Sequence, residues 1–100
     1  MTESSCRIIE VIRSVPKGKV SSYRDIALRA GLPNGARQVA RALHSLSGKH
    51  ALPWHRIVKA DGFIALENGS GAELQAELLQ KEGVEVSSGN RIDLEKYLWR

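Results

Sequence analysis

The run Leu52-Pro53-Trp54-His55-Arg56 carries the side chains whose types and spacing point most directly to chemistry. A histidine can draw the proton from a neighbouring thiol and so make it a strong nucleophile. The residue before the histidine is Trp54, however, and its indole nitrogen is only a hydrogen-bond donor because its lone pair belongs to the ring. The run therefore offers a histidine base without a neighbouring nucleophile.

The remaining thiol and imidazole groups do not supply the missing nucleophile or a metal site. Cys6 is the only cysteine, so no internal disulfide can form, which is consistent with a reducing compartment. Its place in an apolar helical pattern predicts a small buried residue rather than a reactive one. The spacing of His44, His50 and His55 matches no zinc pattern, so we expect no metal and no cofactor.

Three helices are predicted ahead of this run. The first covers about residues 2–15, and the second follows Ser22, which is expected to cap it, and stops at Gly31. The third covers about residues 35–46 and is expected to be capped by Asn34. Helical spacing predicts that the inward residues are Ile8, Val11, Ile12, Val15, Tyr23, Ile26, Ala27, Ala30, Ala36, Val39, Ala40, Leu43 and Leu46.

The second and third helices, joined by a tight glycine-containing turn, predict a helix-turn-helix over about residues 22–46. Arg37, Arg41 and His44 share the outward face of the third helix, beside Gln38 and Ser45. This basic stripe favours nucleic-acid binding, although an ordinary helical hairpin also has a polar outer face.

The second part of the chain is expected to complete a mainly α, winged helix-turn-helix-like domain. Ile57-Val58 and Phe63-Ile64 flank a turn sequence, which predicts a small β-hairpin as the wing. Ser70 and Glu73 match a capping box at the start of a fourth helix. This helix is expected to end at Gly83, with Leu74, Leu78 and Leu79 as its apolar side, and the apolar segment 92–100 to dock back on the domain.

Length and composition are those of one small globular domain over residues 1–100. The hydrophobic content of 42% excludes a disordered chain, and no apolar run approaches the roughly 18 residues of a membrane helix. Residues 1–5 lack the layout of a signal peptide, so we expect a cytoplasmic, nucleoid-associated protein that makes no membrane contact.

The charge is divided unevenly along the chain. Residues 1–60 hold eleven Lys and Arg against three acids, a net +8, whereas residues 61–100 hold four against eight, a net −4. A concentrated positive region indicates a polyanionic partner, and the acidic remainder could meet another protein. A solvated surface would give the same totals, so charge alone does not decide between these interpretations.

Several motifs in order then resemble one family over nearly the whole length. They are 16–23 (Pro-Lys-Gly-Lys-Val-Ser-Ser-Tyr), 36–39 (Ala-Arg-Gln-Val), 53–56 (Pro-Trp-His-Arg) and 82–84 (Glu-Gly-Val). The chain resembles the alkyltransferase-like proteins, which are non-enzymatic relatives of O6-alkylguanine-DNA alkyltransferase and carry tryptophan in place of the cysteine of Pro-Cys-His-Arg. The resemblance implies the fold of the alkyltransferase C-terminal domain.

The resemblance also implies how DNA would be held. The helix-turn-helix would bind the minor groove, and the damaged guanine would rotate out of the stack. Arg37 would fill the gap, since its planar, charged head can stack on bases and hydrogen-bond the orphaned cytosine. Tyr23 would crowd the target phosphate and offer its hydroxyl to the flipped base. The implied DNA-binding residues are Tyr23, Ala36, Arg37, Gln38 and Arg41.

The implied lesion pocket is built from Tyr23, Leu43, Trp54, His55 and Ile57, with Leu43 on its floor. The backbone around Trp54 and Ile57 would accept hydrogen bonds from the guanine amino group. Trp54 would give the alkyl group an apolar wall that tolerates adducts of different size.

The residues that would activate the cysteine in the enzymes correspond to His55 and Glu82. Our hypothesis is that they persist here, with Arg56, as a hydrogen-bonded scaffold beneath the pocket. The chain departs from the enzymes at Leu46, where they have an asparagine that links the recognition helix to the active-site turn. Packing is expected to replace that link. The loop 65–71 is also one residue longer than in the enzymes, so its contacts are not assigned.

The expected function is a DNA-damage sensor that binds duplex DNA containing O6-alkylguanine and passes the lesion to nucleotide excision repair. An active alkyltransferase is excluded on chemistry, because the only thiol lies far from the motif in sequence. The alternative is a winged helix-turn-helix transcription regulator without lesion specificity. Such regulators usually dimerise, and the sequence offers no obvious dimer segment, so we expect a monomer.

Overall fold

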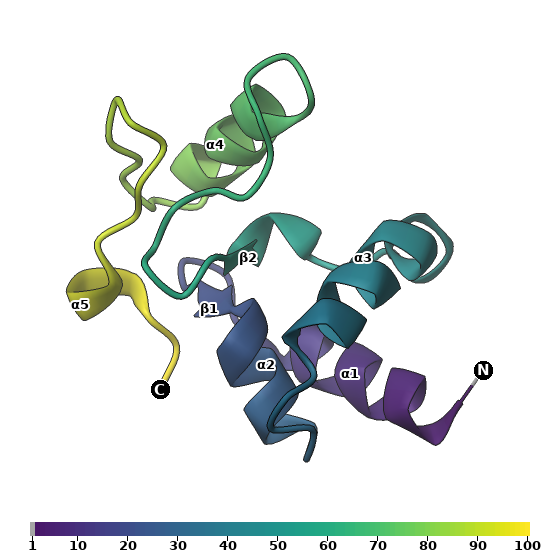
Figure 1. Ribbon diagram of the computed structural model, residues 1–100. Coiled ribbons are helices and arrows are strands. Elements are labelled where there is room, and N and C mark those ends of the chain that lie inside the picture. The colour runs from purple at the N-terminus through teal and green to yellow at the C-terminus, as the bar shows by residue number, and fades with distance from the viewer. Residues whose placement is uncertain (1) are drawn as a thin grey trace.

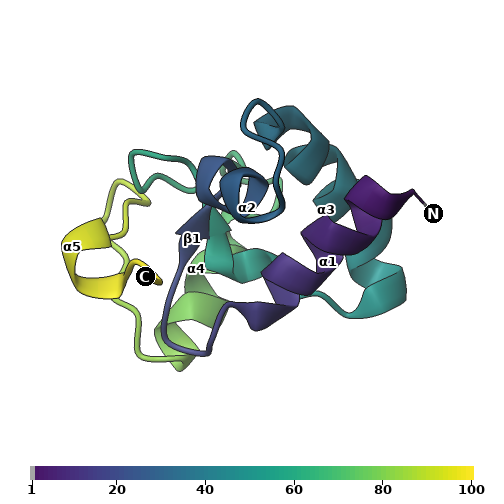
Figure 2. The ribbon, with the colours of Figure 1, turned by 90° about the horizontal axis from the view of Figure 1, so that it is seen from below.

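The computed structural model describes residues 2–100 and confirms a mainly helical fold (Figure 1). Helices α1, α2 and α3 gather on one side, and α4, α5 and the C-terminal segment lie on the other, with a short two-stranded sheet between them (Figures 1 and 2). The elements are α1 (Glu3–Ser14), β1 (Ser21–Ser22), α2 (Tyr23–Arg29), α3 (Ala36–His50), the 3-10 helix η1 (Trp54–Arg56), β2 (Ile57–Val58), α4 (Ala72–Lys81) and α5 (Leu94–Tyr97).

Local capping explains where the first two helices begin. The Thr2 side chain accepts a hydrogen bond from the Ser5 amide and caps α1. The Ser22 hydroxyl accepts from the Asp25 amide at 3.0 Å and caps α2, which confirms the predicted cap. Tyr23 is therefore the first residue of α2, and the cap fixes its position.

Glycine rather than asparagine shapes the turn before α3. Gly31 has a φ of 78° and ends α2, as predicted. Gly35, not Asn34, is the N-cap of α3, and no side chain caps it. A Cβ at Gly35 would lie 2.7 Å from the Cβ of Leu32, so only glycine allows the chain to fold back this closely. The predicted Asn34 cap is wrong.

The sheet differs from the predicted hairpin. β1 pairs with β2 in parallel, with Ser21 opposite Ile57. The Lys59 amide does donate to the Phe63 carbonyl at 2.9 Å, but Phe63 forms its antiparallel bridge with Arg91. Ile57 and Val58 thus pair with an early segment of the chain, and no wing is built from 57–64.

The parallel pair, called here the strand junction (residues 21–22 and 57–58), separates two hydrophobic cores. Successive strand residues point to opposite faces, so Ile57 belongs to the first core and Val58 to the second. The first core contains Ile8, Ile9, Ile12, Val15, Ile26, Ala27, Ala30, Val39, Ala42, Leu43, Leu52 and Ile57. The second contains Val20, Val58, Ile64, Ala72, Leu79, Val84, Ile92 and Tyr97.

The second core is closed by α4 and by the C-terminal segment. The predicted capping box does not form, since Gly71 is the N-cap of α4 and the Glu73 carboxylate accepts from the Gly69 amide at 2.8 Å. The C-terminal segment docks back as expected. The Trp99 amide donates to the Val20 carbonyl at 2.8 Å, and Arg29 of α2 lies 4.0 Å above the centre of the Trp99 ring.

Three predicted inward residues face outward. Cys6 is exposed, because it lies about 120° around α1 from Ile12 at 100° per residue. Ala40 is exposed on α3, and Ala42 takes the expected core place. Leu74 is exposed on α4, where the buried stripe is Ala72, Gln75 and Leu79.

Within residues 2–100, no helix has the length and the apolar character required to cross a membrane. Over the same residues, no group of three or more His, Cys, Asp or Glu side chains is placed to hold a metal ion.

Candidate functional site

A cavity of about 430 Å³ lies between α3 and η1 and is called here the central cavity. Its volume falls within the range of sites that hold small organic groups. Tyr23, Leu43 and Trp54, which the sequence assigns to one pocket, lie together in its wall. The full lining is Tyr23, Ala40, Leu43, His44, Ser47, Trp54, Leu66 and Gln75.

Tyr23 reaches the central cavity from the first turn of α2, because Ser22 caps that helix. Its ring also packs against the first core. Burial raises the pKa of the Tyr23 phenol, so the group is neutral at pH 7 and its hydroxyl is available as a hydrogen-bond donor.

The basic face of α3 adjoins the central cavity. Arg37, Gln38 and Arg41 are exposed, and Ala36, the first residue of the helix, is half-buried. His44 is exposed and also lines the cavity, so it belongs both to this face and to the pocket. A polyanion lying along α3 would therefore lie beside the cavity mouth.

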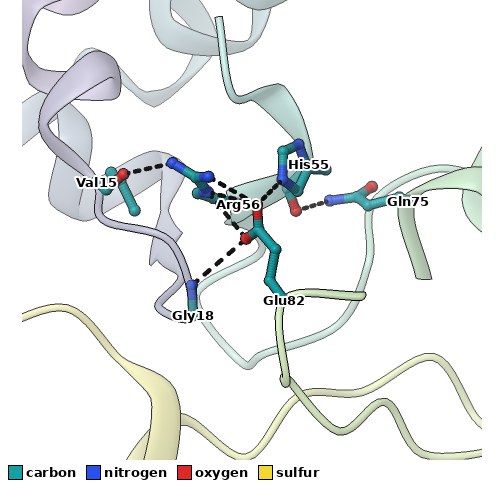
Figure 3. A network of polar contacts seen from close by, with 6 residues as sticks. All are labelled: Val15, Gly18, His55, Arg56, Gln75 and Glu82. Carbon is teal, nitrogen blue, oxygen red and sulfur yellow. Dashed lines mark hydrogen bonds and ion pairs between the residues drawn. The ribbon is translucent and has the colours of Figure 1, made fainter. Parts of the chain in front are cut away.

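Beneath η1, one carboxylate gathers a set of donors that we call the Glu82 network, formed by Val15, Gly18, His55, Arg56 and Glu82 (Figure 3). Glu82 Oε2 lies 2.9 Å from His55 Nε2 and 2.7 Å from Arg56 Nη2. Arg56 Nε donates to Oε1 at 3.0 Å, and Arg56 Nη1 donates to the Val15 carbonyl at 2.9 Å. The network joins η1 to the ends of α1 and α4.

The electrostatics of the network keep Glu82 ionised. The pKa of the carboxyl is lowered to about 2, chiefly by its hydrogen bonds with Arg56 and also by the contact with His55, against a partial opposing effect of burial. The side chains are shielded, with 11% of Glu82, 14% of His55 and 17% of Arg56 exposed. A bidentate arginine–carboxylate pair in this setting holds a fixed geometry.

His55 and Ile57 are placed differently from Trp54. The His55 ring turns toward Glu82, and the Ile57 side chain is fully buried in the first core, so neither lines the central cavity. Their backbone carbonyls both accept hydrogen bonds from Gln75 Nε2, at 3.0 Å each.

The sequence did not place five of the lining residues in the pocket, namely Ala40, His44, Ser47, Leu66 and Gln75. The spacing of Ala72, Gln75 and Leu79 on one face of α4 is the signal that could have revealed Gln75, because it places a polar residue within a buried stripe. Leu66 carried no such signal, since it lies in the loop 65–71 outside any periodic segment. Leu46 packs against the first core.

Cys6 does not line the central cavity; it lies exposed on α1. The cavity wall is therefore free of thiols, while the side chains of a histidine-based activating pair are retained next to it.

Comparisons with known proteins agree with this geometry. Residues 3–84 match the family described as 6-O-methylguanine DNA methyltransferase, DNA binding domain. A DNA base-flipping protein of Vibrio parahaemolyticus is 42% identical over 100 residues, a match that covers all of this chain and 99% of that protein. Alkyltransferase-like protein 1 of Schizosaccharomyces pombe is 34% identical over 105 residues, covering 100% of this chain and 97% of that protein.

A solved structure agrees over the same extent. The structure of S. pombe Atl1 in complex with damaged DNA containing O6-carboxymethylguanine matches with a TM-score of 0.90 and 32% sequence identity, across 100% of this chain and 97% of that chain. The chain thus belongs to the 6-O-methylguanine DNA methyltransferase DNA-binding family, among its alkyltransferase-like and base-flipping members.

Proposed function

We propose that this protein is a non-catalytic sensor of DNA damage that binds O6-alkylguanine in duplex DNA. In this proposal α3 binds the minor groove, the damaged base rotates into the central cavity, and Trp54 forms the wall against which the alkyl group rests. The observation that carries the proposal is the shared position of His44, which links the basic face of α3 to the rim of a largely apolar cavity.

The cavity chemistry supports binding without alkyl transfer. Removal of the alkyl group would need a nucleophile next to the flipped base, and no thiol lines the cavity. Tyr23 cannot take that part at neutral pH, because burial raises the pKa of its phenol. His55 and Glu82 then act as the scaffold of the pocket rather than as a base and its orienting partner.

Arg37 and Trp54 would each offset part of the free-energy cost of base flipping. Rotating a base out of the duplex costs a few kcal/mol, and a planar arginine inserted into the gap offsets part of that cost. Burying the alkyl group against Trp54 and Leu66 contributes about 25 cal/mol per Å² of apolar surface. Larger alkyl groups therefore gain at least as much as methyl.

We also propose that the bound complex is passed to nucleotide excision repair. A protein that does not react with the lesion can release it, which suits a signalling part. The acidic segment 61–100 offers a surface of opposite charge to the DNA-binding part, where a repair protein could bind. The protein would act as a monomer on chromosomal DNA in the cytoplasm.

The test is a binding titration with three matched oligonucleotides, namely a duplex with one O6-methylguanine, the same duplex with guanine, and the damaged single strand. Salt is fixed and then varied, because affinity for the backbone alone falls steeply with salt. The proposal expects a strong preference for the damaged duplex that persists at high salt. It also expects no radiolabel on the protein after incubation with DNA carrying a labelled alkyl group.

Equal affinity for the damaged and undamaged duplexes would contradict the proposal. That result would favour the alternative, a winged helix-turn-helix regulator that reads DNA without regard to the lesion.

A further inference from the structure

Gln75 is a buried polar residue outside the Glu82 network. It lies on the inward face of α4 between Ala72 and Leu79, and only 2% of its surface is exposed. A polar side chain in such a place costs free energy unless it is hydrogen-bonded. The partners of its amide therefore show what the position requires.

The amide nitrogen of Gln75 donates to the backbone of one short segment. Nε2 donates to the His55 carbonyl, a contact drawn in Figure 3, and to the Ile57 carbonyl, at 3.0 Å each. The opposite assignment of the amide would set its oxygen against two carbonyl oxygens, so the nitrogen faces this segment. The amide carries two N–H groups, one for each carbonyl.

The two carbonyls lie on either side of the point where η1 ends and β2 begins. His55 is the middle residue of η1, and Ile57 is the first residue of β2. The strand is fixed in place, because Ile57 pairs with Ser21 and its side chain is fully buried in the first core. A side chain that holds both carbonyls sets the angle at which η1 leaves β2.

The position of Trp54 depends on that angle. Trp54 is the first residue of η1 and lines the central cavity. Its ring stands edge-on to the His55 ring, with the ring centres 6.1 Å apart and the planes at 86°. The His55 imidazole is held by Glu82 at 2.9 Å and the His55 carbonyl by Gln75, so the surface beside the indole is fixed twice.

Gln75 and Glu82 hold η1 by different chemistry. Glu82 binds the side chains of His55 and Arg56 through its charge. Gln75 is neutral and binds the backbone. The contribution of Gln75 can therefore be measured with the charge of the Glu82 network intact.

We propose that Gln75 is a positioning residue for the Trp54 wall: its two hydrogen bonds fix the angle of η1 and so place the indole where a flipped, alkylated base meets it. Gln75 needs no contact with the base for this part. The inference rests on the proposed function and deepens it, since it names a residue that sets the shape of the lesion site. A wall held in place before the base arrives loses less conformational freedom on binding, so the preference for the lesion depends on Gln75.

The first measurement follows the Trp54 indole in the protein without DNA. The chain has two tryptophans, so all variants are made in a Trp99→Phe parent, in which Trp54 is the only one. Gln75→Met keeps the length of the side chain and removes both donors. The Trp54 emission of this variant is expected to shift to longer wavelength and its quenching by acrylamide to increase, because η1 is held less firmly and the indole meets more water.

Leu79→Val is the matched control. Leu79 lies on the same inward face of α4 and is fully buried in the second core. The substitution loosens the packing of α4 but leaves the hydrogen bonds of Gln75 in place. It is expected to lower the melting temperature without changing the emission or quenching of Trp54. Far-UV circular dichroism reports whether each variant is folded.

Gln75→Glu adds a test that depends on protonation. The ionised carboxylate has no donor and faces two carbonyl oxygens, whereas the protonated acid has one O–H donor. Burial against these carbonyls favours protonation, so Trp54 quenching in this variant should fall toward the parent value between about pH 8 and about pH 5. The parent and Gln75→Met should show no such fall, and their histidines are the same. This profile decides the question if Gln75→Met does not fold.

The second measurement is a titration with matched duplexes that carry O6-methylguanine or guanine. The ratio of the two affinities is expected to fall about tenfold in Gln75→Met, the scale set by about one to two neutral hydrogen bonds. The ratio is expected to stay unchanged in Leu79→Val.

The outcomes separate this inference from the proposed function. If Trp54 emission and quenching are the same in the parent and in folded Gln75→Met, or change as much in Leu79→Val, Gln75 does not position the wall. Quenching in Gln75→Glu that is independent of pH would show that its hydrogen bonds do not hold η1. If Trp54 responds but the affinity ratio does not, the position of the wall does not set the lesion preference, and the inference is wrong. If the parent binds both duplexes equally, the proposed function fails, while the fluorescence still decides whether Gln75 places Trp54.

Discussion

Replacing Glu82 with glutamine should reveal how much of the protein's stability depends on one ionised carboxylate. Glutamine has nearly the same shape, and its carbonyl oxygen can still accept from Arg56. The substitution removes the negative charge that faces a guanidinium of which only 17% is exposed. The Glu82→Gln variant therefore tests the charge of the network separately from its packing.

The size of the effect follows from the pKa of Glu82, which is lowered from 4.5 to about 2 in the folded protein. Each pKa unit corresponds to about 1.4 kcal/mol, so the ionised carboxylate contributes about 3 kcal/mol to folding at neutral pH. The side chain is only 11% exposed, so solvent screens this contribution little. A total stability of about 5–15 kcal/mol is usual for a small domain, which makes the expected loss large.

The sign of the pH dependence is set by the direction of the shift. Because the folded pKa lies below the unfolded one, the contribution is complete above about pH 4.5 and is lost as the pH falls toward about 2. The wild-type protein should be more stable than Glu82→Gln by about 3 kcal/mol at pH 7, and the two should converge near pH 2.

The assay is urea denaturation followed by far-UV circular dichroism at a series of pH values from 7 to 2. Glu77→Gln is the matched control, because Glu77 is 61% exposed and, within residues 2–100, pairs only with Lys81, one turn away on α4. Its effect should stay within about 0.5 kcal/mol at every pH. A difference between wild type and Glu82→Gln that stays constant from pH 7 to pH 2 would refute the reasoning, since it would show that the charge of Glu82 does not stabilise the fold.

Three further outcomes are expected. Arg37→Ala should reduce the preference for the damaged duplex about tenfold or more, as measured by the same binding titrations. Arg37→Lys should keep the general affinity for DNA but recover little of this preference. An unchanged preference would show that Arg37 takes no part in the proposed flipping step. Trp54→Ala should weaken the binding of benzyl adducts more than that of methyl adducts, because the larger benzyl group loses more buried apolar surface. If the affinity of the wild-type protein falls steadily from methyl to benzyl adducts, Trp54 does not form an apolar wall for the alkyl group. Trp99→Ala should lower the free energy of unfolding by about 1–2 kcal/mol, because it removes the contact with Arg29 and packing on the first core. The affinity for DNA should not change. A loss of DNA binding in a folded variant would place the C-terminal segment in the DNA interface.

Local patterns predicted the features that depend on neighbours in sequence. The spacing of Ile8, Ile12 and Val15 gave the first helix, and the Ser22 cap gave the start of the second. The family resemblance also predicted that Tyr23 and Trp54 belong to one pocket, and both line the central cavity. Helical spacing alone could not have predicted this, because it carries no information about residues that are distant in sequence.

The remaining features depend on partners distant in sequence. The hairpin prediction failed because β2 pairs with Ser21 and Ser22, more than 30 residues earlier, and Phe63 bridges to Arg91. Gln75 was missed because polarity indicates an outward residue, and only the fold shows that the backbone carbonyls of His55 in η1 and Ile57 in β2 lie within reach of its amide. The position of Cys6 was wrong because its apolar character was given more weight than the helical spacing, which places it about 120° around α1 from Ile12.

The strand junction joins the two cores through only two residues on each strand, but further contacts tie the two parts of the chain together. The wall of the central cavity takes Leu66 and Gln75 from residues 61–100 and the rest from residues 1–60. Gln75 donates a hydrogen bond to the His55 carbonyl of η1, and Glu82 accepts one from Arg56 of η1, beside the junction. The chain should therefore melt in a single cooperative transition, and a base held in the cavity should raise the melting temperature of both halves together, since it binds only where they meet.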